Sequence, residues 1–128
     1  MSFNSILLVD DDVGVRQIAQ QTLEGVGHRV VCAGDGRAAS RAMAADAFDL
    51  VITDLLMPDR DGLELIEELR RSYPGVRIIA MSGGGRVSAE EYLLIAKFLG
   101  ANGLLGKPFH PRQLLAAVEQ ALAAPSNR

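Results

Sequence analysis

Short apolar runs alternate along this chain with longer stretches in which apolar residues recur every three or four positions, and the alternation repeats five times. The short runs are almost continuously apolar, which is typical of strands covered on both faces. The longer stretches are typical of helices with one buried side. Together they predict a parallel sheet wrapped by helices. We expect strands at residues 5–10, 29–33, 50–53, 77–81 and 103–105.

The helices that connect these strands are marked by their apolar stripes and by glycine, proline and capping residues at their ends. The first is indicated by a repeat at three and four residues and should stop at Gly25 and Gly27; the repeat consists of Val15, Ile18, Ala19, Thr22, Leu23 and Val26. The others are expected over residues 36–45, through Leu63, Ile66 and Leu69 up to Pro74, from Ser88 to about Gly100, and from Pro111 through Leu122. The predicted fold is therefore α/β, a flavodoxin-like doubly wound five-stranded parallel sheet with five helices.

Length and composition narrow the class of protein. The 128 residues suit one compact domain, and no linker or low-complexity segment interrupts them, so we expect a single domain over residues 1–128 without an effector domain. The net charge is −3, from 13 basic and 16 acidic residues, with no basic run. Direct binding to nucleic acid is therefore not expected.

The first apolar run and the cysteine usage bear on location. Residues 6–9 form an apolar run of only four residues without a basic segment before it, too short for a signal peptide or a membrane span. Cys32 is the only cysteine and lies in an apolar stretch, as a small buried residue would. These features predict a cytoplasmic protein with no membrane association.

Polar residues stand where the apolar runs end. Asp10 and Asp11 follow the first run, Asp54 the third, Ser82 the fourth and Lys107 the fifth. In an open parallel sheet the carboxyl ends of the strands meet at one edge, where ligands bind. Three carboxylates, a hydroxyl and an ammonium at one edge suit a divalent cation and a phosphoryl group.

Nearby residues of the same types have simpler roles. Asp12 is better placed to cap the first helix than to bind metal. Asp59 and Asp61 belong to a turn. The glycines at 83–85 lack the spacing of a phosphate-binding loop, which favours a hinge.

Four segments together carry a family resemblance. They are Leu8-Val9-Asp10-Asp11, the run from Thr53 to Gly62, Met81-Ser82-Gly83, and Lys107-Pro108-Phe109. From Ile6 to Leu122 the chain resembles a single-domain response-regulator receiver of two-component signalling. The resemblance implies a switch that gains a phosphoryl group from a histidine kinase or histidine phosphotransfer protein and then changes partner binding.

The same resemblance assigns roles to residues. It implies that Asp54 is the phosphoacceptor and that Mg²⁺ is bound by Asp11, Asp54 and the backbone carbonyl of Leu56, with Asp10 acting through water. Lys107 and Ser82 would register the new charge. The Lys107–Pro108 peptide would be cis. Leu104 stands where the family commonly has an aromatic switch residue.

The resemblance also implies partners. A downstream protein would bind the face formed by the fourth helix, the fifth strand and the fifth helix. The fourth helix is more apolar than a helix with one buried side requires, so its apolar residues either serve that partner or a homodimer, or pack deeply in the core. The chain would not be an enzyme beyond its own self-phosphorylation and self-dephosphorylation.

Two other functions fit parts of the pattern. Asp10 and Asp12 have the spacing of a haloacid-dehalogenase-like phosphatase, which also forms an aspartyl phosphate with Mg²⁺, although the chain is short for a substrate cap. A receiver-like binding module that is never phosphorylated is the other alternative. The aspartate that becomes phosphorylated, Asp54 or Asp10, distinguishes the first alternative from the receiver.

Overall fold

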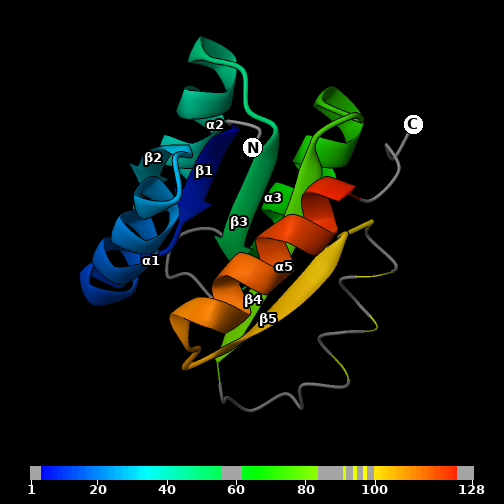
Figure 1. The fold of residues 1–128 in the computed structure, drawn as a ribbon. Coiled ribbons are helices and arrows are strands. Elements are labelled where there is room, and N and C mark those ends of the chain that lie inside the picture. The colour runs from blue at the N-terminus through cyan, green and yellow to red at the C-terminus, as the bar shows by residue number, and fades with distance from the viewer. Residues whose placement is uncertain are drawn as a thin grey trace.

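A single twisted parallel sheet forms the centre of the molecule (Figure 1). The computed structural model describes residues 4–55, 62–83, 91, 94, 97 and 100–123. The strands are β1 (Ser5–Val9), β2 (Arg29–Ala33), β3 (Leu50–Asp54), β4 (Arg77–Gly83) and β5 (Gly103–Lys107). They lie in the order β2-β1-β3-β4-β5, and each neighbouring pair is parallel. This is the predicted doubly wound α/β fold of the flavodoxin-like type.

Four helices lie wholly within the described residues. They are α1 (Val13–Gly25), α2 (Gly36–Ala45), α3 (Gly62–Ser72) and α5 (Pro111–Ala123). The predicted helix that ends near Gly100 falls largely outside the described residues, where only Glu91, Leu94 and Lys97 are described, as helical. In the described part of the chain no helix combines the length and the apolarity needed to cross a bilayer.

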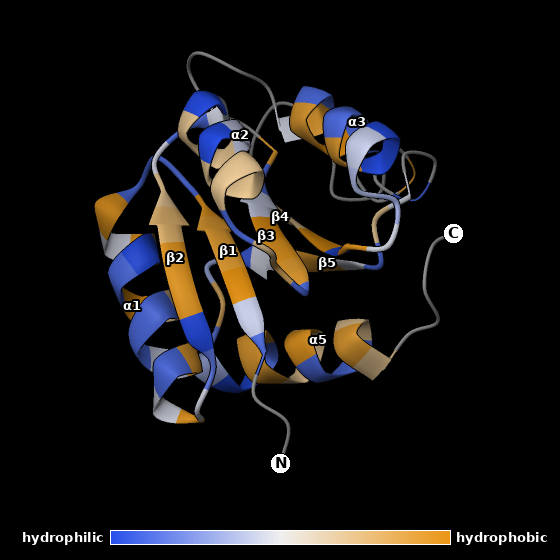
Figure 2. Ribbon diagram, turned by 90° about the horizontal axis from the view of Figure 1, so that it is seen from above, coloured by the Kyte–Doolittle hydropathy of each residue, from blue (hydrophilic) through white to orange (hydrophobic). Residues whose placement is uncertain are grey.

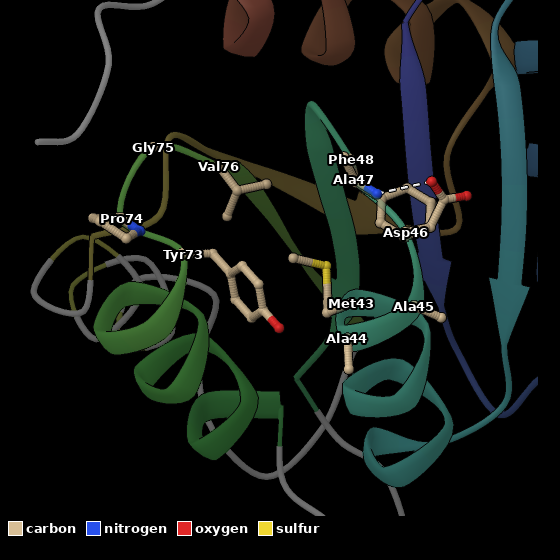
Figure 3. A pocket seen from close by; sticks show the side chains of 10 residues that line it. All are labelled: Met43, Ala44, Ala45, Asp46, Ala47, Phe48, Tyr73, Pro74, Gly75 and Val76. Atoms are coloured by element: carbon tan, nitrogen blue, oxygen red, sulfur yellow. Dashed lines mark hydrogen bonds between the residues drawn. The ribbon is translucent and has the colours of Figure 1, made fainter.

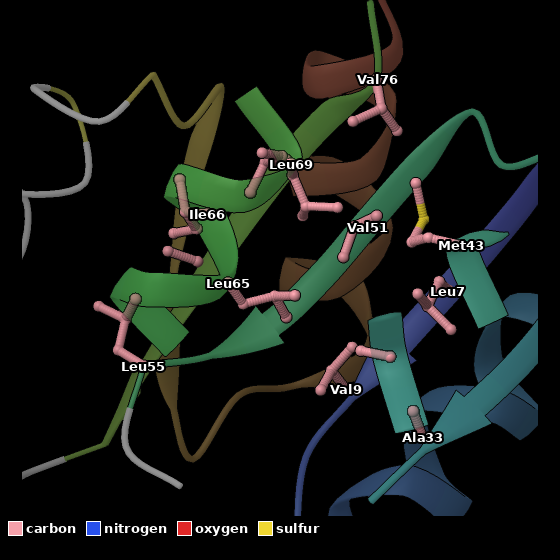
Figure 4. Packing of buried hydrophobic residues seen from close by; sticks show 13 residues of the cluster. Leu7, Val9, Ala33, Met43, Val51, Leu55, Leu65, Ile66, Leu69 and Val76 are labelled. Atoms are coloured by element: carbon pink, nitrogen blue, oxygen red, sulfur yellow. The ribbon is translucent and has the colours of Figure 1, made fainter. Parts of the chain in front are cut away.

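The helices cover the two faces of the sheet in pairs, with α2 and α3 on one face and α1 and α5 on the other (Figure 2). Successive residues of each strand point to opposite faces. Leu7, Val9 and Val51 therefore pack with Met43 of α2 and with the buried leucines of α3 (Figure 4). The residues between them pack with α1 and α5, in a second cluster that contains Ile6, Leu8, Ile52, Ala19, Leu23, Leu114 and Val118.

The last two strands are longer than the apolar pattern predicts. β4 runs to Gly83 rather than residue 81, and β5 runs to Lys107 rather than residue 105. Ser82 pairs with Gly106, and Gly83 pairs with Lys107. Backbone pairing extends these strands past the end of their apolar residues, because ladder hydrogen bonds do not require apolar side chains.

The apolar repeat that predicts α1 is only partly buried. Ala19 and Leu23 are fully buried, but Ile18 is 53% exposed and Val26 is 37% exposed. Ile18 points about 100° around the helix from the buried Ala19, toward solvent. Periodicity predicts that the helix has an apolar face. How much of that face is buried depends on which elements cover it.

Arg70, in the last turn of α3, is hydrogen-bonded to the loop that precedes β4 and to the segment that precedes β5. Its guanidinium donates hydrogen bonds to the backbone oxygens of Val76 (2.7 Å), Pro74 (3.1 Å) and Gly100 (3.1 Å). A fourth bond, of 3.3 Å, reaches the side chain of Asn102 just before β5. Burial lowers the pKa of Arg70 from its usual value. The acceptors are therefore organised around a guanidinium that has lost part of its hydration.

Replacing Arg70 with methionine should lower the free energy of unfolding by about 2–4 kcal/mol, because several backbone carbonyls lose their donor together. Arg71→Met is the matched control, since Arg71 is exposed, and it should change stability by less than about 0.5 kcal/mol. Chemical denaturation of both variants measures the difference. Equal stabilities would show that water satisfies these carbonyls as well as Arg70 does.

Candidate functional site

The polar residues expected at one edge of the sheet do meet there. Asp10 directly follows β1, and Asp54 is the last residue of β3. Asp54 pairs with Met81, so that Ser82 lies one position further along the next strand, and Lys107 ends β5 opposite Gly83. The parallel register thus brings the carboxyl ends of four strands to one place.

Three carboxylates form the acidic part of this site. One ligand oxygen from each of Asp10, Asp11 and Asp54 lies within 4.8 Å of the others. Asp10 is fully buried and Asp54 is 5% exposed, whereas Asp11 is exposed. Carboxylate oxygens are the donors that Mg²⁺ prefers, and two carboxylates with several waters are its usual protein ligands. The donor set therefore fits Mg²⁺, and its exposed side leaves access for an ion.

Lys107 balances part of the negative charge. Its Nζ donates to Asp10 Oδ2 at 3.0 Å and lies 3.2 Å from Asp54 Oδ2. Burial pulls the pKa of Lys107 down, but the hydrogen bond to Asp10 and the charges of Asp54 and Asp10 outweigh it and hold the pKa above its usual value. Lys107 is therefore a fixed ammonium at physiological pH.

Every polar group of Asp10 is hydrogen-bonded within the protein. Its Oδ1 accepts from the Asp12 backbone N–H at 2.9 Å, and its Oδ2 accepts from Lys107. Its backbone N–H donates to the Ala33 carbonyl at 3.1 Å, and its own carbonyl accepts from Arg16 at 2.7 Å. A carboxylate with both oxygens already bonded suits contact with a metal through water better than direct ligation.

The neighbouring acidic residue is a helix cap, as predicted. Asp12 Oδ1 accepts from the Val15 backbone N–H at 3.2 Å at the start of α1. Ser82 is 8% exposed at the end of β4, and the Lys107–Pro108 peptide is cis. Leu56, Asp59, Asp61 and the glycines after Gly83 lie outside the described residues.

Two residues beside the site make close contacts that the sequence pattern does not indicate. Gly62 ends one of the four family segments, and a Cβ there would lie 2.1 Å from the backbone oxygen of Asp54. Arg16 holds the carbonyl of Asp10. A basic residue close to a helix N-terminus opposes the helix dipole. That unfavourable placement was the available signal for a specific contact.

The described residues also line a cavity of about 680 Å³, but it lies away from the carboxylates. It is formed between the ends of α2 and α3 by residues that precede β3 and β4, including Met43, Phe48 and Tyr73 (Figure 3). Asp54 lies at the opposite end of β3, and Asp10 and Asp11 lie close to it. The cavity therefore takes no part in the site.

Comparison with known proteins identifies the family. The sequence model of the response regulator receiver domain matches residues 6–119. The chain belongs to this family, whose members act as phosphorylation-dependent signalling switches in two-component systems and not as enzymes in their own right. The match favours the receiver over a haloacid-dehalogenase-like phosphatase.

Individual relatives agree with this assignment. The chain is 38% identical over 125 residues to the DNA-binding transcriptional regulator NtrC of Azospirillum brasilense, covering 95% of this chain and 25% of that protein. Among solved structures it is similar to the chemotaxis response regulator CheY4 of Vibrio cholerae, with a TM-score of 0.85, 31% identity, and coverage of 94% of this chain and 99% of that one. It is also similar to NtrX of Brucella abortus, with a TM-score of 0.88, 31% identity, and coverage of 94% and 27%. The chain thus spans about a quarter of the length of NtrC.

Proposed function

We propose that Asp54 accepts a phosphoryl group from a phosphohistidine of a histidine kinase or histidine phosphotransfer protein. A bond forms between an Asp54 carboxylate oxygen and phosphorus while the phosphorus–nitrogen bond breaks, and the donor imidazole leaves with the electron pair of that bond. The observation that carries the proposal is the cluster of Asp10, Asp11 and Asp54 with the Lys107 ammonium beside it. This transfer requires positioning and charge neutralisation more than covalent help from the protein.

Asp11, Asp54 and the backbone carbonyl of Leu56 would hold Mg²⁺, with Asp10 acting through water. When bound, the ion offsets the charge of the carboxylates and of the phosphoryl oxygens. The chain's own contribution is to hold the Asp54 carboxylate in place beside a positive charge. Its strand position and the nearby Lys107 ammonium support this role.

The added charge is about −1.5 to −2, and it would be registered by Lys107 and Ser82. Lys107 lies 3.2 Å from the Asp54 carboxylate, so its partner changes as soon as Asp54 carries a phosphoryl group. Ser82 and Gly83 pair with Gly106 and Lys107, so a shift at the end of β4 would be passed to β5. Leu104 packs against the core cluster on the α3 side and offers no hydroxyl or ring for a switch. The strand ends are therefore the proposed moving parts.

The partner would bind the face that includes the fourth helix, β5 and α5. β5 is an edge strand of the sheet, and Leu94 is 69% exposed in the helical segment before it. An exposed large apolar residue in the segment that precedes an edge strand suits a downstream protein or a second copy of the chain. Receiver proteins transmit signals between kinases and effectors. Action in the cytoplasm through contact with other proteins forms part of this proposal.

The acceptor is tested by incubating the protein with acetyl phosphate and Mg²⁺ and measuring its intact mass. The wild-type protein should gain one phosphoryl group, and Asp54→Asn or addition of a chelator should abolish the gain. Asp12→Asn is the matched control, because asparagine also caps helices well, and it should be phosphorylated like the wild type. A phosphoryl group that persists in Asp54→Asn would place the acceptor elsewhere. A wild type that never gains one would favour the non-phosphorylated binding module.

A further inference from the structure

Arg16 connects the first turn of α1 to the peptide that carries the acidic pair. Its guanidinium Nη1 donates to the backbone oxygen of Asp10 at 2.7 Å. That oxygen belongs to the peptide unit between Asp10 and Asp11, so the bond fixes the plane from which the Asp11 side chain projects. On the other side of Asp10, the backbone N–H is fixed by the Ala33 carbonyl.

The guanidinium of Arg16 lies close to the backbone of Gly34. An ideal Cβ at residue 34 would lie 3.0 Å from Nη1 and 3.9 Å from Cζ of Arg16, so the guanidinium lies close against the backbone that follows β2. A side chain at residue 34 would therefore displace the guanidinium slightly. Arg16 thus lies between the Asp10 carbonyl, to which it is bonded, and the backbone of Gly34.

The charge of Arg16 is unfavourable at this position for two reasons. A cation near the N-terminus of a helix opposes the helix dipole. A cation near a divalent metal site also repels the ion. The contact with the Asp10 carbonyl is the feature that accounts for an arginine here, since its rigid planar fork reaches a fixed acceptor.

We propose that Arg16 is a positioning residue of the metal site. By holding the Asp10–Asp11 peptide, it keeps the Asp11 carboxylate turned toward Asp54. Its loss weakens Mg²⁺ binding even though a positive charge is removed. The inference rests on the proposed metal role of Asp11 and Asp54.

The sign of the change in affinity tests this inference. The probe is Mg²⁺ alone, titrated calorimetrically into the unphosphorylated protein. If Arg16 acted only through its charge, Arg16→Gln would bind Mg²⁺ more tightly than the wild type. Positioning predicts the opposite, a loss of about tenfold, as is usual when a partner that orients a metal ligand is removed. Arg16→Lys keeps the charge but not the planar fork, and it should also bind more weakly.

Two comparisons separate positioning from general stability. Arg29 begins β2, at the end of the strand away from the carboxylates, and pairs with Asp46. Arg29→Gln should therefore leave the Mg²⁺ affinity unchanged. Thermal unfolding with chelator and with Mg²⁺ gives the second comparison. A structural role alone would lower both transitions equally, whereas positioning predicts a smaller gain from Mg²⁺ in Arg16→Gln than in the wild type.

Gly34→Ala disturbs the same contact with the charge kept. The added Cβ forces the guanidinium to move by a few tenths of an ångström, so a smaller loss of Mg²⁺ affinity is expected, and no further loss when it is combined with Arg16→Gln. Equal or tighter Mg²⁺ binding by Arg16→Gln overturns the inference. A wild type that does not bind Mg²⁺ instead overturns the proposed function from which it starts.

Discussion

Gly62→Ala should destabilise the protein severely, by about 3 kcal/mol or more, and distort the site around Asp54. A Cβ at residue 62 would lie 2.1 Å from the Asp54 backbone oxygen and 2.7 Å from the Leu55 Cα. Both atoms belong to the backbone at the end of β3, so no side-chain rotation relieves the contact. The Gly62 N–H also donates to the Leu55 carbonyl at 3.1 Å, which fixes the start of α3 against the strand.

Helix propensity alone predicts the opposite change in stability, because it favours alanine over glycine by up to about 1 kcal/mol. Gly25→Ala is the matched control, because Gly25 also lies in a helix and a Cβ there meets nothing within 4 Å. It should stabilise the protein by about 0.4–1 kcal/mol. Denaturation midpoints of the two variants give the comparison. If Gly62→Ala does not fold, its circular dichroism spectrum without urea already shows the predicted loss of structure. A variant as stable as the wild type contradicts the prediction.

Lys107→Met should lower the free energy of unfolding by about 3 kcal/mol when metal is removed by a chelator. The reason is that Asp10 and Asp54, both buried, lose the ammonium that lies 3.0 and 3.2 Å from their oxygens. Added Mg²⁺ should recover much of this loss, because it supplies positive charge to the same carboxylates. Lys97→Met is the control, since Lys97 is exposed, and it should have little effect in either condition.

The pH dependence of this difference has a defined sign. The pKa of Lys107 is raised above its usual value of 10.5 in the folded protein. A group with a raised pKa contributes its full stabilisation below its unfolded pKa and loses it as the pH rises through its folded pKa. In chelator, the stability difference between the wild type and Lys107→Met should therefore be constant near neutral pH and shrink above pH 10.5. A difference that grows at alkaline pH would contradict the role assigned to the ammonium.

The sequence by itself determined the order of strands and helices and the edge at which the polar residues meet. Continuous apolar runs and helical stripes are local signals, and right-handed crossovers limit how such elements can be arranged. Residues that end successive parallel strands must then share one edge. The positions of Asp10, Asp54, Ser82 and Lys107 could for this reason be predicted without a structure.

Only the tertiary structure decided which atoms meet at that edge and beyond it. The contact of Arg16 with the Asp10 carbonyl, the close approach of Gly62 to Asp54, and the bonds from Arg70 to Val76 and Gly100 all join separate elements. The exposure of Ile18 and the extension of β5 to Lys107 also depend on which neighbours lie alongside. Hydrophobic periodicity carries no information on such contacts, because they arise from the depth and rotation at which finished elements pack.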